Sequence, residues 1–165
     1  MLSRRSLLVG TSAIVVGGGA MGLFSKSEAA ADQHFAVAHS DAEWRRLLTP
    51  EQYHVLREQG TEPAWSSPLD HEKRTGIFAC AGCQNELYRS QDKFNSGTGW
   101  PSFTRPIEGA VDTSQDRSFF MVRTEVHCHR CGGHLGHVFE DGPPPTGLRY
   151  CMNGLAMTFT PEKTS

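Results

Sequence analysis

The stretch GIFACAGC at residues 76–83 joins a short β-type run to a C-x-x-C pair, and it decides how the rest of the chain is interpreted. A second pair, Cys128 and Cys131, begins after a gap of 44 residues. Each pair can form a tight turn that directs two thiolates at one ion, and two such pairs in one small domain are typical of a tetrahedral zinc site. We therefore predict a structural zinc bound by Cys80, Cys83, Cys128 and Cys131.

Two other uses of these cysteines are open at this point, two disulfides or one thioredoxin-type redox pair. A redox pair needs a strand that feeds a helix, whereas the residues around Ala81 and Gly82 indicate a strand and a turn. A site closed by four thiolates has no position for a substrate, so zinc would contribute stability and not chemistry. The flanking His127 and His129 are then expected to face solvent.

Outward from the first pair, the chain divides into a short helical part and a long β part. Ser40 with Glu43 forms a capping box, and the sequence TPEQ at 49–52 supplies a cap, a first-turn proline and a glutamine for a second helix that ends near Gly60. Short apolar runs at 76–80, 119–122 and 155–159 predict strands, and DGPPPTG at 141–147 predicts a long hairpin loop. The expected fold is mainly β, with two short helices at its start.

Residues 1–31 have the layout of an export signal. Arg4 and Arg5 precede an uncharged stretch diluted by glycine, and Ala29, Ala30 and Ala31 supply small residues for cleavage after Ala29 or Ala31. This pattern resembles a twin-arginine signal and predicts a periplasmic protein. The alternative is an uncleaved anchor, because residues 6–25 are long enough to span a bilayer, although five glycines disfavour it. We assign 32–42 to a tether and helix start, and 43–160 to the folded domain.

The composition limits the classes of function. A chain of 165 residues with 21% charged and 38% hydrophobic residues is one compact domain. The formal net charge is −2, and loss of residues 1–31 leaves 13 basic and 17 acidic residues, a net charge of −4. Nucleic acid is therefore not an expected partner. Five cysteines and eight histidines direct attention to metal and thiol chemistry.

The fifth thiol, Cys151, is a candidate nucleophile. In a strand, Arg149, Cys151 and Asn153 share one face, and the charge of Arg149 is expected to favour the thiolate. Upstream, Gly136 separates His134 from His137 and can kink the strand. A hairpin through 141–147 would return Cys151 beside a face made by His137, Phe139 and Asp141. The alternative is an inert buried cysteine.

These residues belong to a set of motifs that resembles the B-type methionine-R-sulfoxide reductases (MsrB). The match spans residues 43–159 and is carried by the motifs WR at 44–45, TPEQY at 49–53, GTE at 60–62, CAGC at 80–83, GWPSF at 99–103, RTEV at 123–126, HLGHVF at 134–139 and RYCMN at 149–153.

The resemblance implies two antiparallel sheets, a structural zinc and Cys151 as the nucleophile. It also implies reduction of the R epimer of methionine sulfoxide. We expect a monomer that receives electrons from a thioredoxin-like donor. The catalytic residues would be Cys151, His134, His137, Arg149, Asp141 and Asn153. The substrate would contact Phe139, Trp100, which forms a pocket for its methyl group, and Trp65, where related sequences often carry Phe.

One position departs from the pattern. Many members carry a cysteine where this chain has Thr98, and that cysteine resolves the oxidised nucleophile as an internal disulfide. The departure implies regeneration of Cys151 by an external thiol.

Two other classes of protein share some of these features. A zinc-ribbon binding module would need no Cys151, so Cys151→Ser would leave its function unchanged. A Cys-His acyl-transfer enzyme would need an oxyanion hole, and no nucleophile-elbow motif is present in the sequence.

Overall fold

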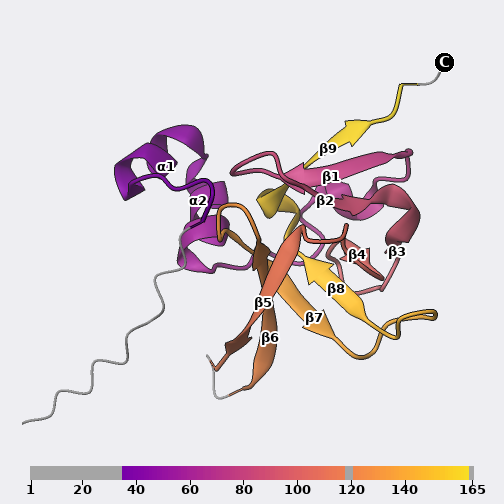
Figure 1. The fold of residues 1–165 in the computed structure, drawn as a ribbon. Coiled ribbons are helices and arrows are strands. Elements are labelled where there is room, and N and C mark those ends of the chain that lie inside the picture. Colours follow the sequence, from indigo (N-terminus) through magenta and orange to yellow (C-terminus); the bar gives the residue numbers. More distant parts are fainter. Residues whose placement is uncertain (1–34, 118–120, 164–165) are drawn as a thin grey trace, which may run out of the picture. The chain divides into compact units, whose positions relative to one another are not determined.

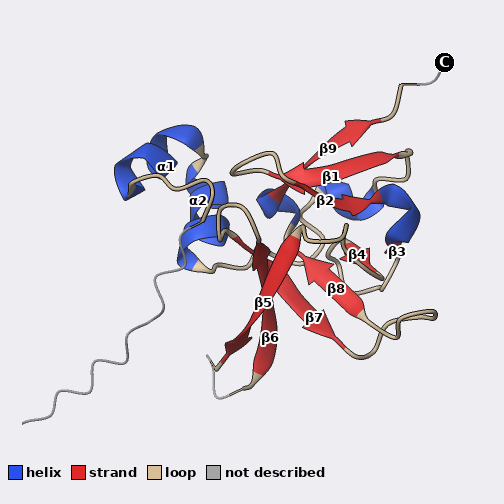
Figure 2. Ribbon diagram, viewed as in Figure 1, coloured by secondary structure: helices blue, strands red, loops and turns tan. Residues whose placement is uncertain are grey.

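The computed structural model describes residues 35–117 and 121–163, so the predicted export signal lies outside the described residues. The described chain contains two antiparallel sheets and two short α-helices, as the sequence predicts (Figures 1 and 2). Within these residues no helix is both long and apolar enough to cross a bilayer.

The two helices are α1 (Asp41–Leu47) and α2 (Pro50–Glu58), and both begin at the predicted caps. The Ser40 backbone N–H donates to the Glu43 carboxylate at 2.8 Å, and the Ser40 hydroxyl accepts from the Glu43 N–H. Thr49 and Gln52 form the same reciprocal pair at α2. Gln59 then ends α2 in the left-handed conformation with φ of 55°. These local bonds satisfy orphan backbone donors, which is why a seven-residue helix forms here.

The smaller sheet has the strand order β2-β1-β9. Its strands are β1 (Gly76–Cys80), β2 (Glu86–Arg89) and β9 (Met157–Pro161). The larger sheet has the order β3-β4-β8-β7-β6-β5. Its strands are β3 (Lys93–Phe94), β4 (Ser102–Phe103), β5 (Val111–Asp116), β6 (Arg123–Cys128), β7 (His134–Phe139) and β8 (Arg149–Met152). Short 3-10 turns lie at Pro68–His71 (η1), Ser90–Asp92 (η2) and Gly154–Ala156 (η4).

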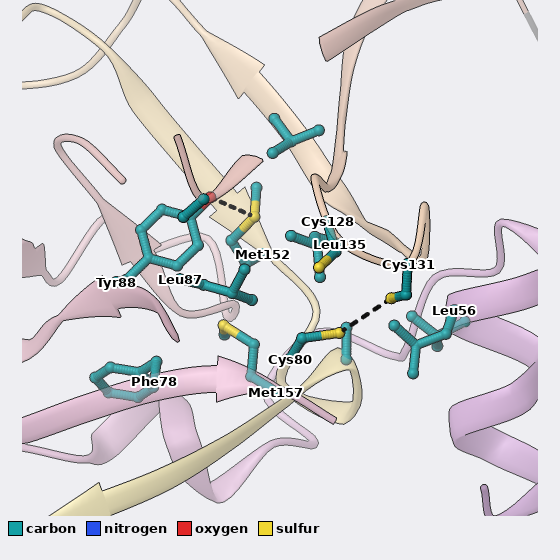
Figure 3. Close-up of a cluster of buried hydrophobic side chains, with 14 of the residues drawn as sticks. Leu56, Phe78, Cys80, Leu87, Tyr88, Cys128, Cys131, Leu135, Met152 and Met157 are labelled. Atoms are coloured by element: carbon teal, nitrogen blue, oxygen red, sulfur yellow. Dashed lines mark hydrogen bonds between the residues drawn. The ribbon is translucent and has the colours of Figure 1, made fainter. Parts of the chain in front are cut away.

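The hydrophobic core draws on both sheets and on α2. Phe78, Leu87 and Tyr88 of the smaller sheet are fully buried, as are Leu135 and Met152 of the larger one. Figure 3 shows these side chains together with cysteines of both pairs, so the cysteine cluster lies at the edge of the same core. Tyr88 donates its hydroxyl hydrogen to the Met152 sulfur at 3.1 Å, which satisfies a buried polar atom.

The predicted strand at 119–122 is not formed by its described residues. Met121 and Val122 lie outside any strand, with 53% and 68% of their surface exposed, while Phe119 and Phe120 lie outside the described residues. Hydrophobicity alone indicated a strand there, but the strand that contributes to the core begins at Arg123. The expected loop at 141–147 does connect β7 to β8.

Candidate active site and cysteine cluster

The four paired cysteines converge into one cluster. Their sulfur atoms all lie within 4.8 Å of one another. Cys80 Sγ lies 3.7 Å from Cys131 Sγ, and Cys83 Sγ lies 3.5 Å from Cys128 Sγ. All four cysteines are free thiols in the structure, so neither of the two alternative disulfides is formed. Four thiolates at about 2.3 Å from a central ion would be separated by roughly 3.8 Å, so the cluster has the dimensions of a tetrahedral metal site.

The cluster joins the two sheets. Cys80 ends β1 and Cys128 ends β6, while Cys83 and Cys131 lie in the turns that follow. Arg57 of α2 donates to the Cys131 carbonyl at 3.0 Å, and the Val37 N–H donates to the Arg130 carbonyl at 2.8 Å. A metal bound here would hold α2 and the segment before α1 against both sheets.

The expectation for the two flanking histidines was half wrong. His129 is exposed and pairs with Asp112 at 2.9 Å, as predicted. His127 is instead 7% exposed, with its ring centroid 6.2 Å from that of Phe35. The two rings meet edge to face, a contact that the local sequence around His127 does not reveal.

Cys151 lies in a row of residues that crosses the larger sheet. It is paired with Ser102 of β4 on one side and with His137 of β7 on the other, and His137 is in turn paired with Glu125 of β6. Directly opposed residues of an antiparallel sheet project from the same face. The hairpin through 141–147 therefore brings the thiol beside His137, as the sequence predicted.

Close approach of β7 and β8 depends on Gly136. A Cβ atom at this position would overlap the carbonyl oxygen of Cys151 and press on Met152. Backbone atoms cannot move aside as a flexible side chain can. Only glycine therefore allows this spacing between the strand that carries His137 and the strand that carries Cys151.

A cavity of about 140 Å³ opens at this row. It is lined by Thr61, Trp100, Arg123, Gly136, His137, Phe139, Cys151, Met152 and Asn153. Five of the predicted site residues therefore share one cavity: Trp100, His137, Phe139, Cys151 and Asn153.

His137 is held by a carboxylate that sequence reasoning missed. Its Nε2 lies 2.8 Å from Asp116 Oδ2, and Arg123 donates to the same oxygen at 2.6 Å. Burial lowers the pKa of His137, and the bond to Asp116 opposes that shift. Asp116 ends β5, 21 residues before His137, so no local motif connects the two.

His134 lies beside His137 because β7 contains a bulge. Val126 pairs with Gly136 and His127 with His134, so two steps along β7 match one step along β6. The extra residue changes the alternation of faces and brings the two imidazole centroids to 5.4 Å. His134 is 3% exposed, and its Nδ1 lies 2.7 Å from the Glu125 carboxylate, which also accepts from Ser114.

The hydrogen bond with His134 lowers the pKa of Glu125, and burial opposes this shift. Glu125 lies in the motif RTEV, which the resemblance highlighted without assigning a role to its members. Neither Glu125 nor Arg123 was predicted as a site residue.

The surroundings of Cys151 raise the pKa of its thiol, whereas we expected them to favour the thiolate. Burial raises the pKa of the Cys151 thiol, while hydrogen bonds from Thr98 and Ser102 and the charge of Arg149 act in the opposite direction. We expected Arg149 to favour the thiolate; it does, but desolvation is the larger influence. Strand alternation could not reveal how deeply the thiol is buried.

Arg149 and Asp141 form an ion pair at the start of the hairpin loop. Both Arg149 nitrogens Nε and Nη2 donate to the Asp141 carboxylate at 2.8 Å, and the guanidinium lies 4.4 Å from the centre of the Phe139 ring. Asp141 is 62% exposed in its side chain and does not line the cavity. Its position is that of a residue that orients Arg149.

Asn153 and Trp100 are tied together through Glu62. Asn153 accepts from the Glu62 N–H at 3.0 Å and donates to the Leu135 carbonyl at 3.1 Å, and the Trp100 indole donates to the Glu62 carbonyl at 3.1 Å. The Glu62 carboxylate accepts from the N–H groups of Gly154 and Leu155, and burial raises its pKa. Glu62 therefore links two cavity walls, a role not predicted from the motif GTE.

Trp65 does not line the cavity. It is 58% exposed, and its backbone N–H donates to the Gly99 carbonyl at 2.7 Å. A side chain at Gly99, where φ is +89°, would collide with the Trp65 indole. Trp65 thus lies against the loop that carries Trp100, outside the predicted pocket wall.

A half-buried thiol opposite a carboxylate-bound histidine, separate from a cluster of four cysteines that could hold a metal ion, is typical of a thiol-dependent enzyme domain. The SelR domain family matches residues 48–161, which is most of the chain. The chain belongs to this family, and it is similar over most of its length to proteins named peptide methionine sulfoxide reductase MsrB.

Three relatives illustrate the similarity. The MsrB of Agrobacterium fabrum is 55% identical over 126 residues, covering 76% of this chain and 93% of the relative. The MsrB of Methanosarcina barkeri is 54% identical over 129 residues, covering 78% and 91%. The MsrB of Leptospira interrogans is 49% identical over 130 residues, covering 78% and 99%.

Proposed function

We propose that this protein reduces the R epimer of methionine sulfoxide, in oxidised proteins and as the free amino acid, with Cys151 as nucleophile. The observation that carries the proposal is the pairing of Cys151 with His137 across adjacent strands at the wall of one cavity. Reduction of a sulfoxide needs a nucleophile at sulfur and an acid at oxygen, and these two side chains supply them.

In the proposed reaction, the Cys151 thiolate attacks the sulfoxide sulfur while protonated His137, assisted by His134, donates a proton to the oxygen as the S–O bond breaks. The bond formed between the two sulfur atoms then breaks as the hydroxyl group displaced from the substrate sulfur bonds to the Cys151 sulfur, so methionine leaves and Cys151 becomes a sulfenic acid. Two electrons pass from the cysteine sulfur to the sulfoxide sulfur. Asp116 supports the acid, because its carboxylate stabilises the imidazolium form of His137.

Selection of the R epimer follows from the shape of the cavity. Trp100 and Phe139 provide apolar wall in the cavity that His137 also lines, so a substrate whose methyl group contacts the indole can direct only one of its two possible S–O bonds to the acid. Separated R and S sulfoxides test this, and equal turnover of the two would contradict it. Cys151→Ser should abolish turnover; an unchanged variant would favour a binding module.

Regeneration of Cys151 is proposed to use an external thiol from a thioredoxin-like protein. Thr98 occupies the position where many members have a resolving cysteine, and its hydroxyl lies 3.8 Å from Cys151 Sγ. The four remaining cysteines form the metal cluster. Each cycle then consumes two donor thiols, which become a disulfide, and releases water.

The test of this regeneration is a single turnover without donor. It should yield about one methionine per enzyme and leave a sulfenic acid that dimedone traps. Thr98→Cys should instead form an internal disulfide with Cys151 and reduce the trapped fraction. An internal disulfide in the unmodified protein would contradict the proposal.

Zinc is the ion proposed for the cysteine cluster. The supporting observations are four thiolate donors without carboxylate or imidazole and sulfur separations that suit a tetrahedron. Its role would be structural, with Cys80, Cys83, Cys128 and Cys131 as its ligands. Metal analysis of the purified protein should give one zinc per chain.

Export through the twin-arginine route to the periplasm is proposed from Arg4 and Arg5. Folding and metal loading before transport would protect five thiols from mispairing in an oxidising compartment. Changing both arginines to lysine should retain the protein in the cytoplasm. Normal export of that variant would contradict this route.

A further inference from the structure

Three hydroxyl groups form a chain that ends at the sulfur of Cys151. Ser96 Oγ lies 2.8 Å from Thr98 Oγ1 and 2.7 Å from Ser102 Oγ. Thr98 Oγ1 lies 3.8 Å from Cys151 Sγ, and Ser102 donates to the Trp100 carbonyl at 3.2 Å. The chain therefore connects the reacting sulfur to a backbone carbonyl through three side chains.

The loop that carries Thr98 is shaped to direct it at the sulfur. Gly97 and Gly99 on either side have φ of +71° and +89°, which other residues adopt at a cost. The Gly97 N–H donates to the Asn95 side chain at 3.0 Å, and the Gly99 carbonyl accepts from the backbone N–H of Trp65. Thr98 is thus held from both sides.

The row of hydroxyl groups can adopt two opposite directions of hydrogen bonding. Each hydroxyl has one hydrogen to donate. When Cys151 is a thiol, its hydrogen can point to Thr98, Thr98 donates to Ser96, Ser96 to Ser102, and Ser102 to the Trp100 carbonyl. When Cys151 loses its proton, every bond of the chain can reverse, and only the carbonyl at the far end loses its donor.

We propose that the Thr98 hydroxyl donates a hydrogen bond to the Cys151 thiolate, and that Ser96 and Ser102 hold it in place by donating along the chain. Thr98 is then a catalytic residue, because it touches the reacting sulfur. Ser96 is a positioning residue, and Ser102, whose hydroxyl also interacts with the sulfur, positions Ser96 when it donates along the chain. Thr98, at the position where many members carry the resolving cysteine, would then stabilise the negative charge of the Cys151 thiolate and would not form a disulfide with it.

The charged and titratable groups around Cys151 set the background for this effect. Arg149 lies on its own strand, His137 on β7 and Arg123 on β6, and the two residues of β4 are uncharged. Arg149 is already engaged by Asp141. Burial opposes ionisation, so a donor at the sulfur has a larger effect here than in water.

The experiment measures the pKa of Cys151 in the full-length, metal-bound protein. The rate of alkylation by iodoacetamide is followed against pH, and mass spectrometry of the peptide that contains Cys151 separates its signal from the other thiols. Thr98→Val keeps the shape and removes the hydroxyl. We expect its Cys151 pKa to rise by about one unit, a roughly tenfold loss of thiolate at neutral pH.

Two further variants make the result specific. Thr98→Ser restores a hydroxyl and should return the pKa close to that of the unmodified protein, whereas Thr158→Val makes the same change in β9 and should not alter it. Ser96→Ala leaves Thr98 in place without its hydroxyl partner and should raise the pKa in the same direction by a smaller amount.

A pKa of Cys151 unchanged by Thr98→Val would overturn the proposal, as would a failure of Thr98→Ser to restore it. If Thr98→Val loses its metal or its fold, Ser96→Ala carries the test, and an unchanged pKa in that folded variant counts against the chain. No substrate is present in these measurements. They therefore stand apart from the reductase proposal, which Cys151→Ser tests by turnover.

Discussion

Asp116→Asn should change the pH dependence of catalysis through His137. The carboxylate oxygen lies 2.8 Å from His137 Nε2, and the two side chains are 17% and 12% exposed. A hydrogen bond to a charged group contributes about 1.5–3 kcal/mol, and 1.36 kcal/mol corresponds to one pKa unit. Loss of the negative charge should therefore lower the pKa of His137 by about 1–2 units. Arg123 would keep its positive charge nearby and act in the same direction.

The rate follows from two opposed ionisations. Catalysis as proposed needs protonated His137 and thiolate Cys151, yet burial lowers the pKa of the first and raises that of the second. At pH values between the pKa of His137 and the pKa of Cys151, the fraction of molecules with protonated His137 and thiolate Cys151 is constant. That fraction depends only on the difference between the two pKa values. Lowering the His137 pKa by 1–2 units should therefore reduce the plateau of kcat/KM by about 10–100-fold and move the acid limb to lower pH by the same 1–2 units.

The assay is kcat/KM for an R-sulfoxide against pH, together with the NMR titration of the His137 ring. Asp112→Asn is the matched control: it is the same change on the same strand, at an exposed carboxylate that pairs with exposed His129. It should leave the profile unchanged, because an exposed pair contributes little. A plateau that falls in Asp116→Asn without movement of the acid limb would refute the electrostatic reasoning and leave only a steric role for the carboxylate.

Three other changes have defined outcomes. Cys128→Ser should lose metal, activity and most of its stability together. The reason is that the free energy of zinc binding, on the order of 10 kcal/mol, is comparable to the whole free energy of unfolding of a domain. One metal ion per chain still bound to this variant would contradict the assigned ligands. Gly136→Ala should destabilise the protein by about 1–3 kcal/mol in urea unfolding, since the new Cβ meets the Cys151 carbonyl; an unchanged midpoint would show that the strands can separate without cost. Trp100→Ala should raise KM for the R-sulfoxide by about tenfold or more and weaken discrimination against the S epimer. Kinetics with separated epimers measure both quantities, and an unchanged KM or unchanged discrimination would contradict the role given to Trp100.

Local signals in the sequence were sufficient for features whose physics is local. The caps at Ser40 and Thr49 satisfy backbone donors within three residues, so the starts of α1 and α2 were predictable from spacing alone. The cysteine pairs made the convergence of the four cysteines predictable in the same way, since each pair lies in a local turn and four thiolates have few other uses together. The strand patterns and the 141–147 hairpin were enough to predict Cys151 beside His137.

Tertiary structure alone decided the features that depend on contacts between distant strands. Asp116 reaches His137 across the sheet, and no periodicity links a carboxylate at the end of one strand to an imidazole 21 residues later. The bulge that brings His134 beside His137 depends on how β6 and β7 pair. The burial of His127 and the raised pKa of Cys151 have the same origin, because desolvation is set by all the atoms packed around a group and not by its neighbours in the chain.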